Sequence, residues 1–335
     1  MRIAIDAMGG DHAPGEIVAG ALQAVREAGD LELFLVGRED AIRQSMKKDD
    51  DLNRVTIIHA SEVIGNNEEP GLAIRRKKDS SMVAAFELVR TGQADAILSA
   101  GNTGALMAGG LLLLGRLAGV SRPALLAEIP VFEGGGVVMM DVGANMDAKP
   151  EQLYQYALIG KIYAREVLEK PDPRIALLNV GVEENKGNAQ IKKAYQLFVE
   201  NGNINFIGNL EAEEIFRNRT DIIISDGFAG NVFLKAFEGI SRDIFACLQS
   251  EILNGLENSA EFSSVLRKLY AKIDVAEYGG AVLIGINGIC IKCHGASKAR
   301  AVTQALLQRA YPFIKNNTND KIKAELELIL KDSPE

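Results

Sequence analysis

Short apolar runs alternate with longer amphipathic segments along most of the chain. The segments 16–28 and 151–168, for example, carry apolar residues at helical spacing. This alternation predicts βαβ units and a mainly parallel sheet covered by helices on both faces. The predicted strands are RIAIDA (2–7), LELFLVG (31–37), RVTIIHA (54–60), DAILSA (95–100), GGVVMMDVG (135–143), RIALLNVG (174–181), NINFIG (203–208) and DIIISDG (221–227).

Two stretches, 95–104 and 221–230, share one pattern. They read DAILSAGNTG and DIIISDGFAG, with Asp, Ser and Gly at matching offsets. An apolar run that ends in glycine is typical of a buried parallel strand leaving its sheet, and glycine lets a ligand approach the backbone closely. The helix that follows would direct free N–H groups at an anion. We therefore expect phosphate-like groups to bind here; the alternative is that two turns merely share common turn residues.

Three further strands end in polar loops. The first is followed by Asp6, Gly9, Gly10, Asp11 and His12, a set suited to binding a polar substrate or transferring a proton. Alternatively, Asp11 caps a helix that has Pro14 in its first turn. The other two loops are DVGANMDAKPE (141–151) and NVGVEENKGN (179–188). The polar residues of any single loop need no explanation beyond exposure to solvent. However, the carboxyl ends of parallel strands share one edge of a sheet, so we expect all five loops that follow these strands to converge on one crevice.

One segment interrupts the alternation. Residues 251–273 are predicted to be helical, and a stripe of apolar residues follows one face of that helix. A basic amphipathic helix can lie on an anionic membrane or receive a partner, whereas core or dimer packing is the alternative. We expect one α/β domain over 1–335 with a helical insertion at about 240–276 that serves dimer, membrane or partner contacts. The stripe comprises Phe262, Val265, Leu266, Leu269, Tyr270 and Ile273, and Arg267, Lys268 and Lys272 lie off it.

Composition narrows the function. The 335 residues with 47% hydrophobic content suffice for one large α/β domain or two lobes. A net charge of −8 argues against nucleic-acid binding, which needs a basic face. Three cysteines and the absence of a leader pattern predict a reduced, cytoplasmic protein. The uncharged stretch 96–115 has the length of a membrane span, but SAGNTG interrupts it, so we interpret it as strand, loop and buried helix.

Several familiar chemistries find no support. Neither a Walker-type loop nor a GxGxxG element is present, so nucleotide binding is not predicted. The haem-like CIKCH at 290–294 continues an apolar strand, and a zinc site would need two further ligands. His59 is interpreted as a strand-end residue and Cys247 as a core residue. No GxSxG elbow or Cys–His pair predicts a covalent nucleophile, so we expect catalysis by positioning and electrostatics, with no cofactor and no metal.

The motifs taken together resemble a known family over nearly the whole chain. They are IAIDAMGGDHAP, RRKKDSSM, SAGNTGALMAGG, DVGAN-DAKPE, LLNVG-EE-KGN, NFIGN-E, SDGFAGNV-LK and YGGA-L-G. In this order they resemble the bacterial phosphate acyltransferases, the fatty acyl-acyl carrier protein:phosphate acyltransferases of phospholipid synthesis. Phosphate acetyltransferases are more distantly similar, through the elements at 99–105 and 229–231.

The resemblance implies an open three-layer αβα sandwich of the isopropylmalate dehydrogenase/phosphotransacetylase kind and a homodimer. It also implies that a long-chain acyl group passes from acyl carrier protein to inorganic phosphate, giving acyl phosphate for phosphatidic acid synthesis. Phosphate is the nucleophile of that reaction, so no covalent acyl-enzyme is required. The protein would be cytoplasmic and peripherally attached to the inner face of the membrane. There it would contact phospholipid or the membrane-bound glycerol-3-phosphate acyltransferase.

The strand exits supply the expected site residues. We expect catalytic roles for Asp6, His12, Asn102, Lys186 and Asn231. Substrate binding is expected of Gly9, Gly10, Asp11, Ser99, Gly101, Thr103, Gly104, Asp141, Asn145, Lys149, Asn179, Asn188, Asp226 and Gly227. Contacts with acidic carrier protein or with membrane are expected of the basic run and the amphipathic helix: Arg75, Arg76, Lys77, Lys78, Phe262, Arg267, Lys268, Leu269 and Lys272.

Three other functions remain open at this point. They are short-chain phosphate acetyltransfer from coenzyme A, a metal-dependent dehydrogenase of related fold, and a non-catalytic scaffold for membrane or carrier protein. The basic run at 75–81 could equally be a solvated helix face, which needs no function.

Overall fold

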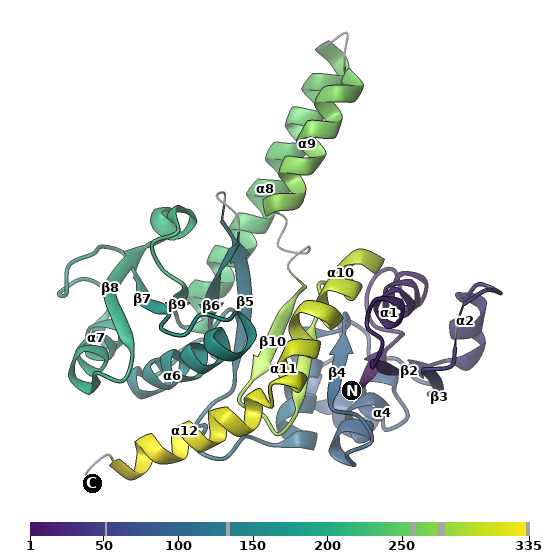
Figure 1. Cartoon of the computed structure of the whole chain (residues 1–335), viewed down its shortest axis with the longest axis horizontal. Helices are drawn as coiled ribbons and strands as arrows, with labels where there is room; N and C mark the ends of the chain where they lie inside the picture. Colours follow the sequence, from purple (N-terminus) through teal and green to yellow (C-terminus); the bar gives the residue numbers. More distant parts are fainter. Residues whose placement is uncertain (51, 132–134, 256–258, 274–278, 333–335) are drawn as a thin grey trace. The chain divides into compact units, whose positions relative to one another are not determined.

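A computed structural model describes residues 1–50, 52–131, 135–255, 259–273 and 279–332 (Figure 1). The chain forms two compact units, each built on its own run of strands. The first unit comprises Met1–Leu125, Arg165–Glu169 and Gly279–Glu335, and the second comprises Leu126–Ala164 and Lys170–Tyr278. The prediction of one domain over 1–335 stays a prediction, and each unit is described by itself.

The first unit holds a mostly parallel sheet. Its strand order is β3 (Val55–His59), β2 (Glu32–Gly37), β1 (Arg2–Asp6), β4 (Ala96–Ser99), β11 (Ile289–Lys292) and β10 (Ala281–Ile284). Only the β10–β11 pair is antiparallel. The register places Ser99 opposite both Asp6 and Lys292, so three polar residues lie side by side where their strands end.

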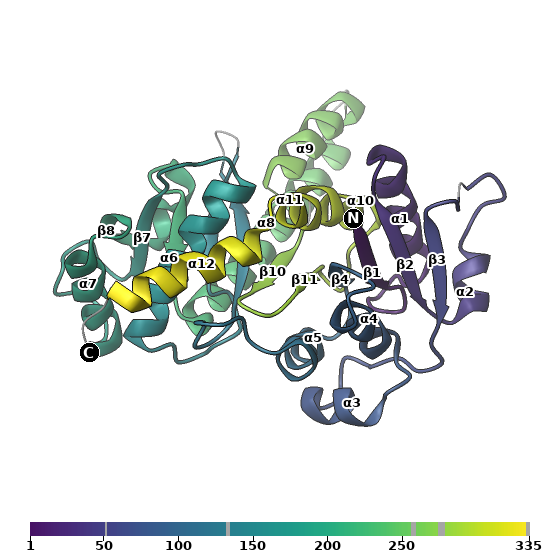
Figure 2. The ribbon, with the colours of Figure 1, turned by 60° about the horizontal axis from the view of Figure 1, so that its bottom comes forward.

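Helices cover this sheet on both faces. The chain moves from β1 through α1 to β2 in one direction, and returns from β3 through α4 to β4 in the other. Right-handed crossovers therefore put α1 and α4 on opposite faces (Figure 2). The helices of this unit are α1 (Gly15–Glu27), α2 (Glu39–Gln44), α3 (Pro70–Arg76), α4 (Ser81–Arg90), α5 (Thr103–Gly109), η1 (Gly110–Leu114), α10 (Ala299–Gln304), η4 (Ala305–Ala310), α11 (Tyr311–Lys315) and α12 (Thr318–Asp332).

The second unit repeats this design. Its strand order is β5 (Ala124–Pro130, which begins in the first unit), β6 (Gly136–Met140), β9 (Ile222–Ile224), β7 (Arg174–Asn179) and β8 (Asn205–Glu211). All pairs are parallel except β5–β6. Its helical segments are α6 (Pro150–Val167), α7 (Ala189–Asn201), η2 (Ala212–Arg217), α8 (Gly227–Gly255) and α9 (Ser259–Ile273). The predicted α/β class with a mainly parallel sheet is confirmed.

The two matching stretches are β4 and β9, and each begins with the same clamp. Asp95 donates its N–H to the carbonyl of Arg2 (2.7 Å) and accepts the N–H of Arg2 (2.8 Å). Asp221 makes the same pair with Arg174, at 2.9 and 2.8 Å. Each of these aspartates therefore ties its strand to the first residue of the neighbouring strand. These contacts within the protein account for the two aspartates without a bound ligand.

The clamp at Asp221 makes a prediction about acid stability. Burial alone would raise the pKa of Asp221, but hydrogen bonds from Arg174 and Lys170 outweigh it and lower that pKa from 3.8 to about 2. The ionised group therefore stabilises the fold above pH 4, and this contribution is lost as the pH falls from about 4 to 2. We expect Asp221→Asn to cost about 2 kcal/mol of unfolding free energy at pH 7 and about half as much at pH 3, measured by urea denaturation. An equal loss at both pH values would contradict this assignment.

Helices α8 and α9 pack against each other as a long hairpin (Figure 1). The expected insertion at about 240–276 lies on these two helices, although 256–258 and 274–276 fall outside the described residues. One expectation here is wrong, because Cys247 is exposed rather than a core residue. Helix α8 continues to Gly255, so residues 251–255 of the predicted helical segment belong to α8 and residues 259–273 form α9.

The uncharged stretch 96–115 is β4, a loop, α5 and η1, as interpreted from the sequence. Its last turn is less buried than expected, because Leu112 is half exposed. Throughout the described ranges, no helix is both long and apolar enough to cross a membrane. CIKCH behaves as the continuation of a strand: Cys290 lies in β11, and both of its cysteines are buried. His59 is the last residue of β3.

Candidate active site

Asp6 lies at the end of β1 in a buried hydrogen-bonded cluster. Its carboxylate accepts hydrogen bonds from Ser81 Oγ and Ser99 Oγ, each at 2.6 Å, and the residue is 2% exposed. Burial raises the pKa of Asp6, while the two hydroxyl groups and the charge of Lys292 oppose that rise. A carboxylate with so little accessible surface is suited to holding loops in place. The predicted catalytic role of Asp6 therefore becomes, in our interpretation, a positioning role.

The loops after β1 and β4 pack backbone to backbone above this cluster. A Cβ atom on Gly9 would lie 2.5 Å from Asp6 Oδ2 and 2.7 Å from Gly101 N, so only glycine fits. The N–H of Gly101 in turn donates to Ser99 Oγ (3.0 Å). The next residues along the β1 loop, Asp11 and His12, are exposed.

The alternative interpretation, in which Asp11 caps helix α1, is wrong. The helix starts at Gly15, and the residue in the cap position is Pro14, with no side-chain hydrogen bond. Asp11 instead donates its backbone N–H to Gly295 O (2.8 Å). The carboxylate of Asp11 is thus not a helix cap.

Asn102 caps α5 and holds a neighbouring loop. Its Oδ1 accepts the N–H of Ala105 (3.0 Å), and its Nδ2 donates to the carbonyls of Gly65 (3.1 Å) and Asn66 (3.2 Å). The amide is thus engaged within the protein, whereas the next residue, Thr103, is exposed. Gly104 follows Thr103 and is half-buried.

The basic run at the end of α3 divides in two. Lys77 donates to Val63 O and pairs with Glu68, both at 2.7 Å, so it anchors a loop. Lys78 contacts the carbonyl of Ile74 at 3.4 Å. The guanidinium groups of Arg75 and Arg76 are exposed and make no hydrogen bond or ion pair with the described part of the chain. Arg75 and Arg76 therefore remain available to an acidic partner.

In the second unit, Asp141 is enclosed by its own loop. The residue is fully buried, and its carboxylate accepts the backbone N–H groups of Gly143 (3.1 Å), Ala144 (2.9 Å) and Asn145 (2.7 Å). Ser225 Oγ donates to the backbone oxygen of Asp141 (2.9 Å). The matching serines of β4 and β9 therefore both bind an aspartate on a neighbouring strand, one through its carboxylate and the other through its backbone.

The start of α8 packs tightly on this loop. A Cβ atom on Gly230 would lie 2.0 Å from the carbonyl oxygen of Asp141, and one on Gly227 would lie 2.9 Å from both N and O of Asn145. Asp226 caps the helix by accepting the N–H of Ala229 (2.7 Å). The structure thereby brings together five predicted residues of the second unit, since Asn231 faces Gly143 from the first turn: Asp141, Asn145, Asp226, Gly227 and Asn231.

The loop after β7 presents Lys186. Asn179 Nδ2 donates to the carbonyl of Lys186 (3.2 Å), and Asn188 caps α7 by accepting the N–H of Ile191 (3.0 Å). The side chain of Lys186 is exposed and has no hydrogen bond or ion pair with any residue that the structure describes. Lys186 comes two residues before Asn188, the N-cap of the 13-residue helix α7. Lys149, just before α6, is exposed as well.

The sequence pattern did not predict the buried polar residues that support these loops. They are Ser81, Lys292 and Asn209. Lys292 Nζ donates to the carbonyl oxygens of Ala100 and Cys293, so a buried cation holds the turn after β4. A charged residue at the end of an apolar strand was the available signal for Lys292. No group of His, Cys, Asp and Glu within the described ranges could hold a metal ion.

Comparison with known proteins identifies the family. A family model described as fatty acid synthesis protein matches residues 1–321. The phosphate acyltransferase of Geobacillus thermodenitrificans is 48% identical over 98% of this chain and 99% of its own length. That of Bacillus cereus is 46% identical over 92% and 93%. The chain belongs to the phosphate acyltransferase family. It is therefore an acyltransferase, and the resemblance carried by the motifs is confirmed.

Solved structures agree on the fold. A phosphotransacetylase from Streptococcus pyogenes has a TM-score of 0.61 and 17% identity, and the match covers 93% of this chain and 94% of that one. A branched-chain phosphotransacylase from Enterococcus faecalis has a TM-score of 0.54 and 16% identity, with 93% and 99% covered. The predicted phosphotransacetylase-like fold of this family member is thus confirmed.

Proposed function

We propose that this protein transfers a long-chain fatty acyl group from acyl carrier protein to inorganic phosphate. The product is acyl phosphate, which would serve the synthesis of phosphatidic acid. The observation that carries the proposal is full-length similarity to proteins named phosphate acyltransferase, within a family described by fatty acid synthesis. The geometry of the loops supports the choice of phosphate as acceptor.

Lys186 is our candidate for binding the phosphate dianion. Its ammonium group is unpaired among the described residues, and the beginning of α7 adds the partial positive charge of its free N–H groups. Asn188 fixes that helix start by capping it. A cation and a helix N-terminus together favour a doubly charged anion over a neutral ligand.

Direct attack by phosphate agrees with the burial of the serine and cysteine side chains that could otherwise act as nucleophiles. Ser99 and Ser225 are at most 1% exposed, and their hydroxyl groups are used in hydrogen bonds to aspartates. Burial raises the pKa of the Cys293 thiol to about 12 and that of Cys290 also rises, so neither supplies a thiolate at neutral pH. None of these four side chains is suited to form an acyl-enzyme.

The remaining predicted residues have complementary roles in this proposal. The amide of Asn231, beside the glycines of α8, would donate to the developing oxyanion of the thioester. Asn145, whose Nδ2 donates to Asp141 Oδ2 (3.1 Å), would hold the Asp141 loop in place. His12 is exposed beside the Gly9–Gly10 loop and would relay a proton or orient the donor. Asp6 would act through the loops that it fixes.

Two surfaces are candidates for receiving the acidic carrier protein. In the first unit, Arg75 and Arg76 offer two exposed charges. In the second unit, Arg267, Lys268 and Lys272 lie on α9. We propose the carrier protein binds one of them, because opposite charges steer association even when the whole protein is acidic.

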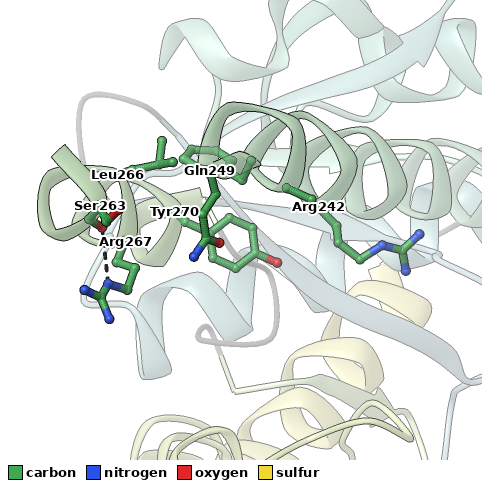
Figure 3. A pocket seen from close by; sticks show the side chains of 8 residues that line it. Arg242, Gln249, Ser263, Leu266, Arg267 and Tyr270 are labelled. Carbon is green, nitrogen blue, oxygen red and sulfur yellow. Dashed lines mark hydrogen bonds between the residues drawn. The ribbon is translucent and has the colours of Figure 1, made fainter. Parts of the chain in front are cut away.

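The hairpin is our candidate for homodimer and membrane contact. It exposes Phe262 (51%), Val265 (56%) and Leu269 (50%) on α9, and Ile240, Ile244 and Leu248 on α8. A groove of about 240 Å³ runs between the two helices, with Phe245, Leu266 and Tyr270 along it and the guanidinium groups of Arg242 and Arg267 pointing outward (Figure 3). Several half-exposed apolar side chains on one hairpin are typical of an interaction surface.

Exchanging apolar for polar side chains on α9 tests that surface. We expect the double variant Val265→Ser, Leu269→Ser to reduce binding to anionic phospholipid vesicles, or dimer stability, by about tenfold, because two half-exposed side chains lose apolar contacts. Vesicle flotation and analytical ultracentrifugation measure the two effects. The matched control is Leu328→Ser on α12, where an exposed leucine of the first unit is changed. Unchanged values in both assays would exclude this face of the hairpin as the contact.

The reaction itself is tested by incubating the protein with palmitoyl-acyl carrier protein and phosphate. We expect phosphate-dependent release of the carrier thiol and formation of palmitoyl phosphate. Acetyl-coenzyme A as a better donor would favour short-chain acetyltransfer instead. An absorbance change with NAD would favour a dehydrogenase. No product with any donor would leave the scaffold as the better explanation.

A further inference from the structure

We propose that Asn209 is a positioning residue that holds Lys186 in place for phosphate. This inference rests on the proposed function of Lys186. Asn209 lies on β8, opposite Leu177 of β7, and its Nδ2 donates to the backbone carbonyl of Glu183 (2.9 Å). It is thus the contact between a strand of the sheet and the middle of the exposed loop that presents Lys186.

The backbone of Lys186 is held on both sides through this loop. Its N–H donates to the same carbonyl of Glu183 (3.1 Å), and its own carbonyl accepts Asn179 Nδ2 (3.2 Å). Residues 182–186 are otherwise exposed, so no core packing fixes them. The Glu183 carbonyl therefore links Asn209 to Lys186 by two consecutive hydrogen bonds.

The burial of Asn209 is unfavourable for stability by itself. The residue is 8% exposed, and its Oδ1 accepts no hydrogen bond from the part of the chain that the structure describes. An orphaned buried acceptor lowers stability, and an apolar side chain would avoid that loss. What an apolar side chain cannot supply is the donor for Glu183. The geometry points to that donor as the reason for an amide at this position.

Removing the Asn209 side-chain donor distinguishes positioning of Lys186 from a contribution to stability alone. We expect Asn209→Ala to raise the KM for phosphate about tenfold with a smaller change in kcat, because Lys186 spends less time where it meets the anion. The unfolding midpoint should change little, since loss of one hydrogen bond is offset by relief of the orphaned acceptor. Amide hydrogen exchange at Lys186 should become faster. The matched control is Asn205→Ala at the other end of β8, where Nδ2 bonds to Asp172 (3.0 Å).

A double-mutant cycle with Lys186→Ala decides whether Asn209 acts through Lys186. In the Lys186→Ala background, Asn209→Ala should change the phosphate KM by less than about twofold, since the two residues belong to one chain of contacts. Additive effects, or a lower unfolding midpoint with unchanged KM and unchanged exchange, would overturn the inference. If Lys186→Ala itself leaves the KM unchanged, the proposed role of Lys186 fails. Unchanged exchange at Lys186 in Asn209→Ala would then overturn the positioning contact separately.

Discussion

Replacing Lys186 by alanine is expected to lower kcat/KM for phosphate by about 100-fold or more. The ammonium group has no partner among the described residues, so its whole charge is available to the dianion and to the charge that develops as phosphate attacks the thioester. Thiol release from acyl-acyl carrier protein at varied phosphate concentration measures the effect. The loss should appear with phosphate as the varied substrate, while the KM for the carrier protein changes little.

The matched control for this change is Lys193→Ala. Lys193 is an exposed lysine on α7 itself, so the variant removes the same charge from the same helix without touching the loop. The kcat/KM of Lys193→Ala for phosphate should stay within about twofold of that of the unmodified protein, since a distant surface charge is screened by salt. If the two variants lose activity equally, general charge rather than a bound phosphate accounts for the effect.

Gly230→Ala is expected to cost about 3 kcal/mol or more of unfolding free energy and most of the activity. The added Cβ would lie 2.0 Å from Asp141 O and 2.7 Å from Ser225 Oγ, so α8 must move away from the loop that it packs on. Urea denaturation and the thiol-release assay measure the two effects.

Another glycine of the same helix provides the contrast. A Cβ atom on Gly239 would meet no other atom within 4 Å, so Gly239→Ala should raise stability by up to about 1 kcal/mol through helix propensity. Equal stability of Gly230→Ala and the unmodified protein would mean that the helix start adjusts freely, and the packing argument would be wrong.

Hydrophobic patterning predicted the strands well. All eight expected runs form strands, because each is a short aliphatic segment bounded by turn residues. Strand β5 was not predicted. Strand β5 comes soon after an uncharged helical stretch, and Glu128 interrupts its apolar residues. It therefore does not stand out as a separate aliphatic segment, as the other eight do. Its antiparallel pairing with β6 depends on partners that local sequence does not specify.

The sequence motifs pointed to the residues at the strand ends, but not to the contacts that each of their side chains makes. Ser99 and Ser225 occupy matching positions, yet their hydroxyl groups bind different atoms of Asp6 and Asp141. Those partners lie 93 and 84 residues away along the chain, so no local pattern reveals them. For the same reason, the sequence did not show that Asp6 is buried whereas His12 is exposed, and a catalytic role was expected of both.

The length of α8 has a mechanical consequence. This helix of 29 residues is about 43 Å long and runs without a break from Gly227 to Gly255. Its first turn carries Asn231 and is clamped on the Asp141 loop, while its far half carries the exposed apolar residues of the hairpin. An unbroken helix is stiff, so we expect a tilt of its far end to move Asn231 as well. The clamped start of α8 and the surface that we propose for partner contacts therefore belong to one rigid element.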